Sequence, residues 1–377
     1  MVPYNRPYLT GRELAYIQQA ADAGQLAGNG SFTRRCQQWL EHELGAPRVL
    51  LTHSCTAALE MSALLLDVEP GDEIIMPSFT FVSTANAFVL RGAVPVFVDI
   101  RSDTLDIDER LIEAAITTRT RAIVPMHYAG VGCDMTTILD IAARHGLSVV
   151  EDAAQGLLST YDGRPLGSLG RLGSISFHET KNVMSGEGGA LVINDRQLVE
   201  RAEILWEKGT NRSQFFRGEI DKYTWVDLGS SYLPGEITAA FLWAQLERAK
   251  EITTERRELW HRYEDACTSL GEFGIRRPVT VPGRTHNEHL FYVILPAHVS
   301  QADVLEELKR RGINAIFHSV PLHSSPAGRR FGRVSGTMEV TDATSARLIR
   351  LPLWVGMGDD TPALVVEQLV STVAARA

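Results

Sequence analysis

Three residues with complementary chemistry are the most informative feature of the sequence. Lys181 ends the run Ser176-Phe-His-Glu-Thr-Lys181, in which a serine hydroxyl precedes the lysine amine by five residues. Asp152 follows an apolar stretch that begins at Leu147 and is typical of a buried strand. A lysine amine can form a Schiff base, and a carboxylate can keep a pyridine nitrogen protonated, so that the ring accepts electrons. Together these residues predict a site for pyridoxal phosphate, with pyridoxamine phosphate as its aminated form.

Each residue alone would be weak evidence, because Asp152 could be a turn residue at a strand end and Lys181 a solvated lysine in a loop. Two further residues favour the cofactor. Gln155 lies one helical turn beyond the strand end, from where its amide could bond a ring hydroxyl. Phe81 could stack on the ring, although an aromatic residue in an α/β protein is more often part of the core.

The run Ser54-Cys55-Thr56 opens a predicted helix directly after a strand. Free N–H groups and the helix dipole make such a position suitable for phosphate, so Cys55 and Thr56 are candidate phosphate ligands. Thr56 could instead be a simple helix cap. Ser176 would supply a second hydroxyl, unless it is an ordinary strand serine. The glycines of Gly186-Glu-Gly-Gly189 precede a strand rather than a helix, so they are no dinucleotide fingerprint and would let the backbone pass close to the cofactor.

Candidate substrate contacts are less specific. His127 stands at a predicted strand end and could approach cofactor or substrate, although a lone histidine there is more often a satisfied core residue. Arg212 and Lys222, interleaved with aromatic residues, suit a sugar carrying a nucleotide diphosphate, and a charged surface loop is an equal alternative. His318 and His323 belong to a loop that could close over substrate. They lack a third ligand at a sensible spacing, so we expect no metal site.

These residues need a scaffold that gathers them, and the order of elements supplies one. Strand-like and helical patterns alternate from about residue 48 to 195, which predicts a mainly parallel sheet with helices on both faces. The predicted strands are 48–52, 72–76, 95–100, 121–125, 147–151, 174–177 and 190–193, and the helices among them are 56–67, 83–90, 108–116 and 135–145. Ligands of such sheets bind beyond the carboxyl ends of the strands, where most of the cofactor candidates lie.

A second unit follows. One helix is expected over 236–264, leading the chain out of the first unit. Shorter elements then follow, with strands at 288–295 and 313–317 and helices at 300–311 and 362–375. We therefore expect a large cofactor-binding domain over 1–250, including an N-terminal arm, and a smaller C-terminal α/β domain over 251–377.

Composition limits the classes of function. The 377 residues are 44% hydrophobic with a net charge of −9, which is ordinary for a soluble globular protein and argues against nucleic acid or an anionic membrane as partner. We see no apolar run of about 18 residues and no secretory signal, so we expect neither a spanning helix nor export. The four cysteines form no CxxC pair, which favours a reducing cytoplasm.

The motifs resemble the DegT/DnrJ/EryC/StrS family of sugar aminotransferases, which have the fold-type I architecture of aspartate aminotransferase. The resemblance extends over nearly the whole chain and is carried by Glu151-Asp-Ala-Ala-Gln155, the run 176–181, the glycines 186–189 and Pro321-Leu-His323. Longer stretches are similar to members that make dTDP-4-amino-4,6-dideoxygalactose, namely 32–39, 81–92 and 208–218.

The resemblance implies a role for each candidate. Lys181 is the Schiff-base lysine and acid–base group, Asp152 pairs with the ring nitrogen, and Gln155 contacts the ring oxygen. Ser176, Cys55 and Thr56 hold the phosphate, and Phe81 stacks on the ring. A homodimer with active sites at the subunit interface is also implied. Ser231 stands where many members have an asparagine that reaches the neighbouring subunit's phosphate, so the sequence departs from the family pattern at that contact.

The resemblance further implies transamination at C4 of dTDP-4-keto-6-deoxy-D-glucose, with L-glutamate as amino donor. The product is a dTDP-4-amino-4,6-dideoxyhexose of galacto or gluco configuration, which the motifs do not distinguish. Amination at C3, or of another nucleotide keto-sugar, is an alternative. So is a non-catalytic sensor of the same fold, which the intact Asp152 and Lys181 oppose. A dehydratase branch of the family has histidine in place of the lysine, and Lys181 counts against it.

Overall fold

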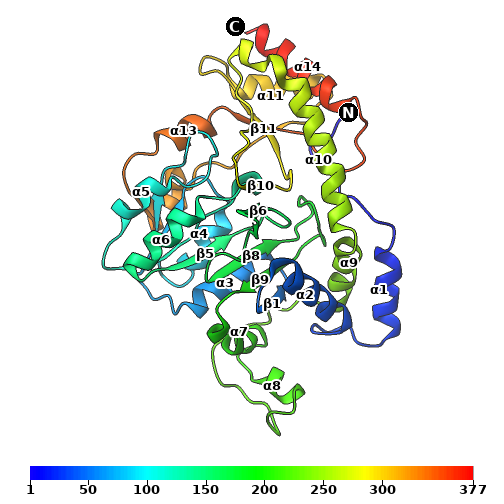
Figure 1. The fold of residues 1–377 in the computed structure, drawn as a ribbon, viewed down its shortest axis with the longest axis vertical. Coiled ribbons are helices and arrows are strands. Elements are labelled where there is room, and N and C mark those ends of the chain that lie inside the picture. Colours follow the sequence, from blue (N-terminus) through cyan, green and yellow to red (C-terminus); the bar gives the residue numbers. More distant parts are fainter. Residues whose placement is uncertain (377) are drawn as a thin grey trace.

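An eight-stranded sheet forms the centre of the computed structural model, which describes residues 1–376 (Figure 1). Its strand order is β1-β9-β8-β5-β4-β2-β3-β13. β9 runs antiparallel to both of its neighbours, and the other pairs are parallel, so the predicted mainly parallel sheet is confirmed. The strands are β1 (Arg48–Thr52), β2 (Glu73–Pro77), β3 (Val94–Val98), β4 (Thr120–Ile123), β5 (Ser148–Asp152), β8 (Leu172–Ser176), β9 (Gly189–Ile193) and β13 (Arg333–Val334).

Helices cover both faces of this sheet, which explains why β2, β8 and β9 are buried at every position. One face packs against α2 (Ser31–Leu44), α5 (Glu109–Ala115), α6 (Met135–His145) and α9 (Glu236–Leu246). The other face packs against α3 (Cys55–Leu65), α4 (Val82–Val89) and α7 (Val199–Trp206). α1 (Glu13–Asp22) lies alongside α9.

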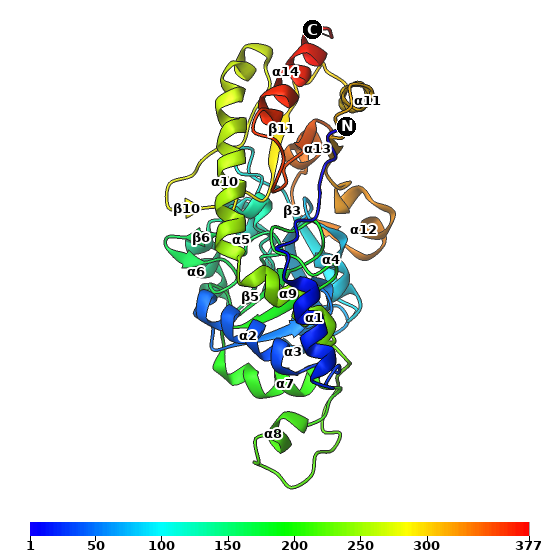
Figure 2. The same ribbon diagram turned by 90° about the vertical axis from the view of Figure 1, so that its right-hand side faces the viewer.

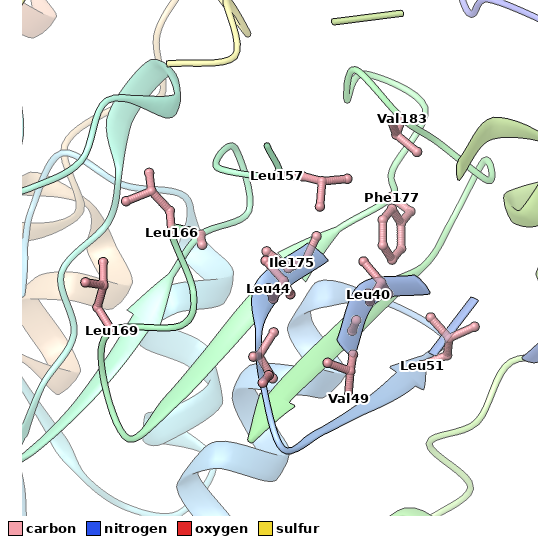
Figure 3. Close-up of a cluster of buried hydrophobic side chains, with 14 of the residues drawn as sticks. Leu40, Leu44, Val49, Leu51, Leu157, Leu166, Leu169, Ile175, Phe177 and Val183 are labelled. Carbon is pink, nitrogen blue, oxygen red and sulfur yellow. The ribbon is translucent and has the colours of Figure 1, made fainter. Parts of the chain in front are cut away.

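The hydrophobic core between the sheet and α2, α5, α6 and α9 extends to the loop that carries Lys181. Figure 3 shows Leu40 and Leu44 of α2 above Val49 of β1, with Phe177 and Val183 at one end of the cluster. Phe177 and Val183 bracket Lys181 in sequence and are almost completely buried. Burial of these two side chains therefore fixes both ends of the loop that carries the amine.

A smaller antiparallel sheet, in the order β11-β14-β12, forms the second core with the helices around it (Figure 2). Its elements are β11 (Phe291–Ile294), β12 (Ile316–Phe317), β14 (Leu348–Leu351), α10 (Ala249–Ala266), α11 (Gln301–Arg310) and α14 (Thr361–Ala374). Shorter elements complete the fold: β6 (Thr160–Tyr161), β7 (Arg164–Pro165), β10 (Arg284–Thr285), α8 (Arg212–Phe216), α12 (Pro326–Phe331) and α13 (Glu339–Ser345). Among residues 1–376, no helix is both long and apolar enough to cross a bilayer.

The helix expected over 236–264 is in fact two helices. The chain leaves helical geometry at Arg248, with φ −112° and ψ 10°, between α9 and α10. α9 packs against α1 and α2 beside the large sheet, whereas α10 packs against α14 beside the small one. One continuous helix would have to pack against both hydrophobic cores with a single apolar stripe. The domain boundary predicted near residue 250 lies at this break and stays a prediction.

The chain also returns to the large sheet after entering the small one. β13 pairs with β3, and Arg333 donates to both carboxylate oxygens of Glu73 at 3.0 and 2.7 Å. The turn Leu322–Ser324 is held by Ser78, whose carbonyl accepts from the amide of Leu322 at 3.0 Å, close to the end of β2. The segment around His323 therefore closes over the carboxyl edge of the large sheet.

Candidate active site

Asp152 lies at the carboxyl end of β5 and is almost completely buried. Two donors hold its side chain: the hydroxyl of Thr84 to Oδ2 at 2.6 Å and the amide of Ala154 to Oδ1 at 3.1 Å. Thr84 belongs to the first turn of α4, which starts beside the end of β2. The carboxylate is thus fixed from the ends of β5 and β2, which lie on either side of β4, and keeps lone pairs for a ligand.

Lys181 lies in the loop between β8 and β9. Its amide donates to the carbonyl of His178 at 2.8 Å, and the amide of Ser185 closes the loop on the carbonyl of Phe177 at 2.7 Å. Burial lowers the pKa of the Lys181 amine, while Cys55 and Asp152 nearby oppose that shift in part. A lysine whose pKa is lowered has more free amine at neutral pH, which is the form that attacks an aldehyde.

The start of α3 lies against the same strands. The side chain of Ser54 caps the helix by accepting from the amide of Ala57 at 3.1 Å, so Thr56 is not the cap. The Thr56 hydroxyl instead bonds that of Ser83, 2.7 Å away in α4. β9 comes so close that a Cβ on Gly189 would lie 2.4 Å from the amide nitrogen of Cys55. The glycine of the 186–189 run is therefore needed for the approach of β9 to the helix start.

Cys55 and Ser176 complete this part of the site. Burial, reinforced by the charge of Asp152, raises the pKa of the Cys55 thiol to about 12, so the side chain stays neutral. The Ser176 hydroxyl, at the end of β8, accepts from the amide of His178 at 3.3 Å. Two hydroxyls and a helix start next to Lys181 suit an anionic phosphate group.

One hydrogen bond orients the side chain of Gln155. Its Oε1 accepts from the amide of Ala129 at 2.7 Å, which leaves Nε2 as a donor without a partner among residues 1–376. Gln155, Ser176, Lys181, Asn182 and His289 line one small cavity. A free amide donor in the same cavity as the lysine fits the ring oxygen of pyridoxal phosphate.

Phe81 is brought to the site but is not packed there. It directly precedes α4, whose Ser83 and Thr84 contact Thr56 and Asp152, and its side chain is 60% exposed. The buried aromatic of this segment is Phe79, whose ring centroid lies 4.0 Å from that of His318. Stacking of Phe81 on a cofactor ring stays a prediction.

His127 has the alternative role of a core histidine. Its Nδ1 accepts from the amide of Cys133 at 3.1 Å, so the proton is on Nε2, which donates to Glu151 at 2.9 Å. The side chain is fully buried. Both ring nitrogens are used within the protein, which favours the role of a core histidine. A contact of His127 with substrate stays a prediction.

The two C-terminal histidines differ. Nδ1 of His323 bonds the hydroxyl of Ser78 at 2.7 Å, and Nε2 lies 3.3 Å from Asp342, so its ring fixes the loop over the sheet edge. His318 is buried between Phe79 and Tyr128, and its Nδ1 contacts the guanidinium of Arg350. Nε2 of His318 has no hydrogen-bond partner among residues 1–376, whereas both ring nitrogens of His323 have one, so His318 is the better candidate to bind a ligand.

The remaining candidates lie on a segment that projects from the large sheet at α8 (Figures 1 and 2). Arg212 lines a groove of about 370 Å³ between α2, α7 and α8, which shares no residue with the cavity at Lys181. Lys222 and Ser231 are exposed, and the backbone of Ser231 pairs with that of Glu207 in an isolated antiparallel β-bridge. Within one subunit, these residues are not brought to the lysine.

Several site residues were not predicted. Thr84 holds Asp152, and its position in the first turn after a strand end was the available signal. Asn182 bonds Nδ1 of His289 at 2.9 Å beside the lysine, and Arg350 acts on the Lys181 amine. His289 and Arg350 come from the small sheet region, whose packing against the large sheet leaves no pattern in the sequence.

Comparisons with known proteins agree with this site. The sequence profile of the DegT/DnrJ/EryC1/StrS aminotransferase family matches residues 7–370. The chain is 32% identical to the spore coat polysaccharide biosynthesis protein SpsC of Bacillus subtilis over 377 residues, covering 97% of this chain and 95% of SpsC.

Solved structures are similar over the full length. The aminotransferase TlmJ of Streptoalloteichus hindustanus superimposes with a TM-score of 0.92 and 30% identity, covering 100% of both chains. Spr1654 of Streptococcus pneumoniae, described as a sugar aminotransferase in its PLP form, gives 0.91 and 25% over 100% of this chain and 99% of that one. These similarities confirm the fold-type I architecture and the expected cofactor, pyridoxal phosphate. The chain belongs to the DegT/DnrJ/EryC1/StrS aminotransferase family and is, like its members, a pyridoxal-phosphate-dependent sugar aminotransferase.

Proposed function

We propose that the enzyme transfers the amino group of L-glutamate to C4 of dTDP-4-keto-6-deoxy-D-glucose. The product is a dTDP-4-amino-4,6-dideoxyhexose, of galacto or gluco configuration. The observation that carries the transamination is the enclosed Lys181 amine, with its lowered pKa, beside a buried Asp152 that keeps free lone pairs. The stretches 81–92 and 208–218 support this choice of sugar substrate, because they are similar to those of members that form the dideoxygalactose product.

Each residue has a defined task in this proposal. When bound, pyridoxal phosphate supplies the electron sink for transamination. Lys181 binds the cofactor aldehyde and later, as a free amine, moves the proton to and from sugar C4. Asp152, oriented by Thr84 and Ala154, holds the proton on the ring nitrogen. Gln155 donates to the ring oxygen, while Ser176 and the start of α3 hold the phosphate.

The nucleotide diphosphate is assigned to the projecting segment. Neither Arg212 nor Lys222 forms an ion pair with a carboxylate of residues 1–376, so both charges are available to a phosphate. Arg212 is held over the rings of Phe216 and Tyr223, at 5.0 and 5.8 Å from their centroids. An oriented guanidinium suits phosphate recognition.

We also propose a homodimer in which this segment completes the partner's site. Trp225 is 77% exposed and Phe216 63% exposed, on a segment that extends away from its own sheet. Such a concentration of exposed aromatic side chains is typical of a protein interface. The unpaired, buried or half-buried thiols of the chain suit the reducing cytoplasm as the place of action.

Nuclear magnetic resonance of the product tests the proposed substrate. The holoenzyme, L-glutamate and dTDP-4-keto-6-deoxy-D-glucose should give a sugar with nitrogen at C4, whose proton couplings define the configuration there. Lys181→Ala is the control and should give no product, because it lacks the amine that moves the proton. Nitrogen at C3, or no conversion beyond this control, would reject the proposed substrate.

A further inference from the structure

His289 is a buried histidine that bonds the lysine loop through only one of its ring nitrogens. Its Nδ1 lies 2.9 Å from Oδ1 of Asn182, the residue that directly follows Lys181. The amide nitrogen of Asn182 donates to the carbonyl of Asn287 at 2.7 Å, so the amide oxygen is the atom that faces the histidine. Because an amide oxygen only accepts, the single ring proton of His289 lies on Nδ1.

The other ring nitrogen, Nε2, has no hydrogen-bond partner among residues 1–376 and is free to accept. Burial lowers the pKa of His289 well below its usual value, so the ring is neutral at neutral pH. The charges of Lys181, Arg256 and Arg350 act in the same direction. His127 shows the contrasting case of a histidine whose two nitrogens both bond within the protein. His289 therefore retains an acceptor that its structural contacts do not use.

This acceptor and the Lys181 amine belong to one small cavity. Lys181 and His289 both line it, and its volume of about 10 Å³ is the room of about one water molecule. Groups around so small a space lie close together. The Lys181 amine forms no hydrogen bond or ion pair with residues 1–376, and its four-carbon stem lets it turn towards any wall of the cavity. A donor without a partner and an acceptor without a partner thus share the same space.

The segment that carries His289 is fixed to the large unit. The side chain of Asn287 donates to the carbonyls of Gln155 and Leu157, both at 2.8 Å. Glu288, between Asn287 and His289, has a φ of 52°, in the left-handed region that a residue with a side chain seldom adopts. Such a conformation persists where the surrounding contacts impose it, and it is found preferentially at functional sites.

We propose that His289 is a positioning residue for Lys181, whose free amine donates a hydrogen bond to Nε2 of the histidine. A primary amine that gives one N–H to this acceptor has its lone pair directed away from the histidine, where it can take a proton from carbon. The inference rests on the proposed function only in taking Lys181 as the group that moves the proton. It does not depend on which keto-sugar accepts the amine.

The contact would also favour the proton transfer itself. Once the Lys181 amine has taken the proton it is an ammonium, and a hydrogen bond from a charged donor is stronger than one from a neutral donor. The neutral Nε2 of His289 therefore stabilises the state after the transfer more than the state before it.

Two substitutions of His289 separate this role from a purely structural one. His289→Asn places an amide nitrogen where Nδ1 is, so it can keep the bond to Asn182, but it lacks the outer acceptor. His289→Gln places an amide oxygen close to the position of Nε2 and loses the bond to Asn182. A structural role predicts that the glutamine variant is the more impaired of the two, whereas the proposed role predicts the asparagine variant.

The half-reaction with L-glutamate, followed by the visible absorbance of the cofactor, measures the difference. The first-order rate constant should fall roughly 30-fold in His289→Asn, the size expected for a hydrogen bond to a charged group, and less than about fivefold in His289→Gln. The apparent Kd of L-glutamate should stay within about threefold of wild type in both variants, because His289 acts on the lysine rather than on the donor.

Chemical labelling gives a readout that does not need turnover. In the pyridoxamine form Lys181 is free, and acetic anhydride acylates only an unprotonated amine. Mass spectrometry of the peptide that contains Lys181, labelled over a range of pH, therefore gives the pKa of its amine. His289→Asn should lower this pKa by roughly 1, because the ammonium loses its acceptor, and His289→Gln should leave it nearly unchanged.

His286→Asn is the matched control, since it is the same change three residues earlier, in a histidine that lines a different cavity. It should leave the rate constant within about twofold of wild type and the pKa of Lys181 unchanged. If His289→Asn does not fold, His289→Phe, which keeps a ring but has no acceptor, takes its place in both measurements.

Three results would overturn the inference: a rate constant of His289→Asn within about threefold of wild type, a glutamine variant slower than the asparagine variant, or an unchanged pKa of Lys181 in His289→Asn. Failure of the proposed function is a separate outcome. If wild type rejects the C4 keto-sugar but its reaction with L-glutamate still depends on the acceptor at position 289, the substrate is wrong and the role of His289 stands.

Discussion

Two neighbouring carboxylates at the end of β5 have opposite surroundings. Glu151 and Asp152 are both almost completely buried, and successive residues of a strand point to opposite faces of the sheet. Glu151 accepts from His127 at 2.9 Å and from three backbone amides, those of Gly167, Leu169 and Gly170, at 2.6 to 2.9 Å. Asp152 accepts from one hydroxyl and one amide and faces the lysine side.

The difference lies in the partners rather than in burial. A backbone N–H can only donate, so the loop 167–170 is held only while Glu151 is an acceptor. The main side-chain partner of Asp152 is the hydroxyl of Thr84, which also lies 2.8 Å from that of Thr80 and can donate or accept. One carboxylate is therefore committed to the fold, and the other is available for chemistry.

The largest effect should follow from Asp152→Asn. We expect turnover to fall by at least roughly a hundredfold, because a ring without a charged partner at its nitrogen is a poor electron sink. The free energy of unfolding should change by less than about 1 kcal/mol, since Thr84 can turn its hydrogen towards Thr80 and accept from the new amide. Steady-state kinetics and urea unfolding measure the two quantities. A rate loss below about tenfold would show that Asp152 is not the ring partner.

Glu151→Gln should give the reverse result. Its amide nitrogen would face backbone donors that cannot accept, so we expect the free energy of unfolding to fall by about 3 kcal/mol. Turnover per folded molecule should stay within about twofold of wild type at a temperature where the variant is folded. Urea unfolding with kinetics on the same samples tests this. A large rate loss without destabilisation would remove the distinction between the two carboxylates.

The smallest effect is expected for His127→Asn. The asparagine oxygen can still accept from Cys133, but the donor to Glu151 is lost, so the free energy of unfolding should fall by about 1–2 kcal/mol. The KM for the sugar nucleotide should be unchanged, because the ring has no free nitrogen and no exposed surface. A tenfold higher KM with wild-type stability would instead support His127 as a substrate contact.

The sequence allows the large unit and the centre of its site to be predicted, because their signals are local. α6 (Met135–His145) and β1 (Arg48–Thr52) have the predicted bounds, because α6 has a clear helical apolar period and β1 is a short, continuous apolar run. Lys181 and Asp152 could be predicted because their chemistry is distinctive at the end of apolar strands. Their placement near each other agrees with the parallel sheet.

Features that depend on distant partners could not be predicted in this way. β13 has two residues, too few for a period, and its position depends on an ion pair between Arg333 and Glu73. The structural role of His127 depends on Glu151, which lies on the neighbouring strand in a register that only the fold defines. Arg350 belongs to β14, which the sequence pattern did not reveal.

Burial of the four cysteine thiols has a practical consequence. It raises the pKa of Cys55 and Cys267 to about 12 and that of Cys36 and Cys133 well above the usual value. Almost no thiolate is present at neutral pH, and thiolate is the species that maleimides alkylate. A cysteine introduced at the exposed position of Lys222 would therefore be the selective attachment point for a fluorophore, without prior removal of the native cysteines.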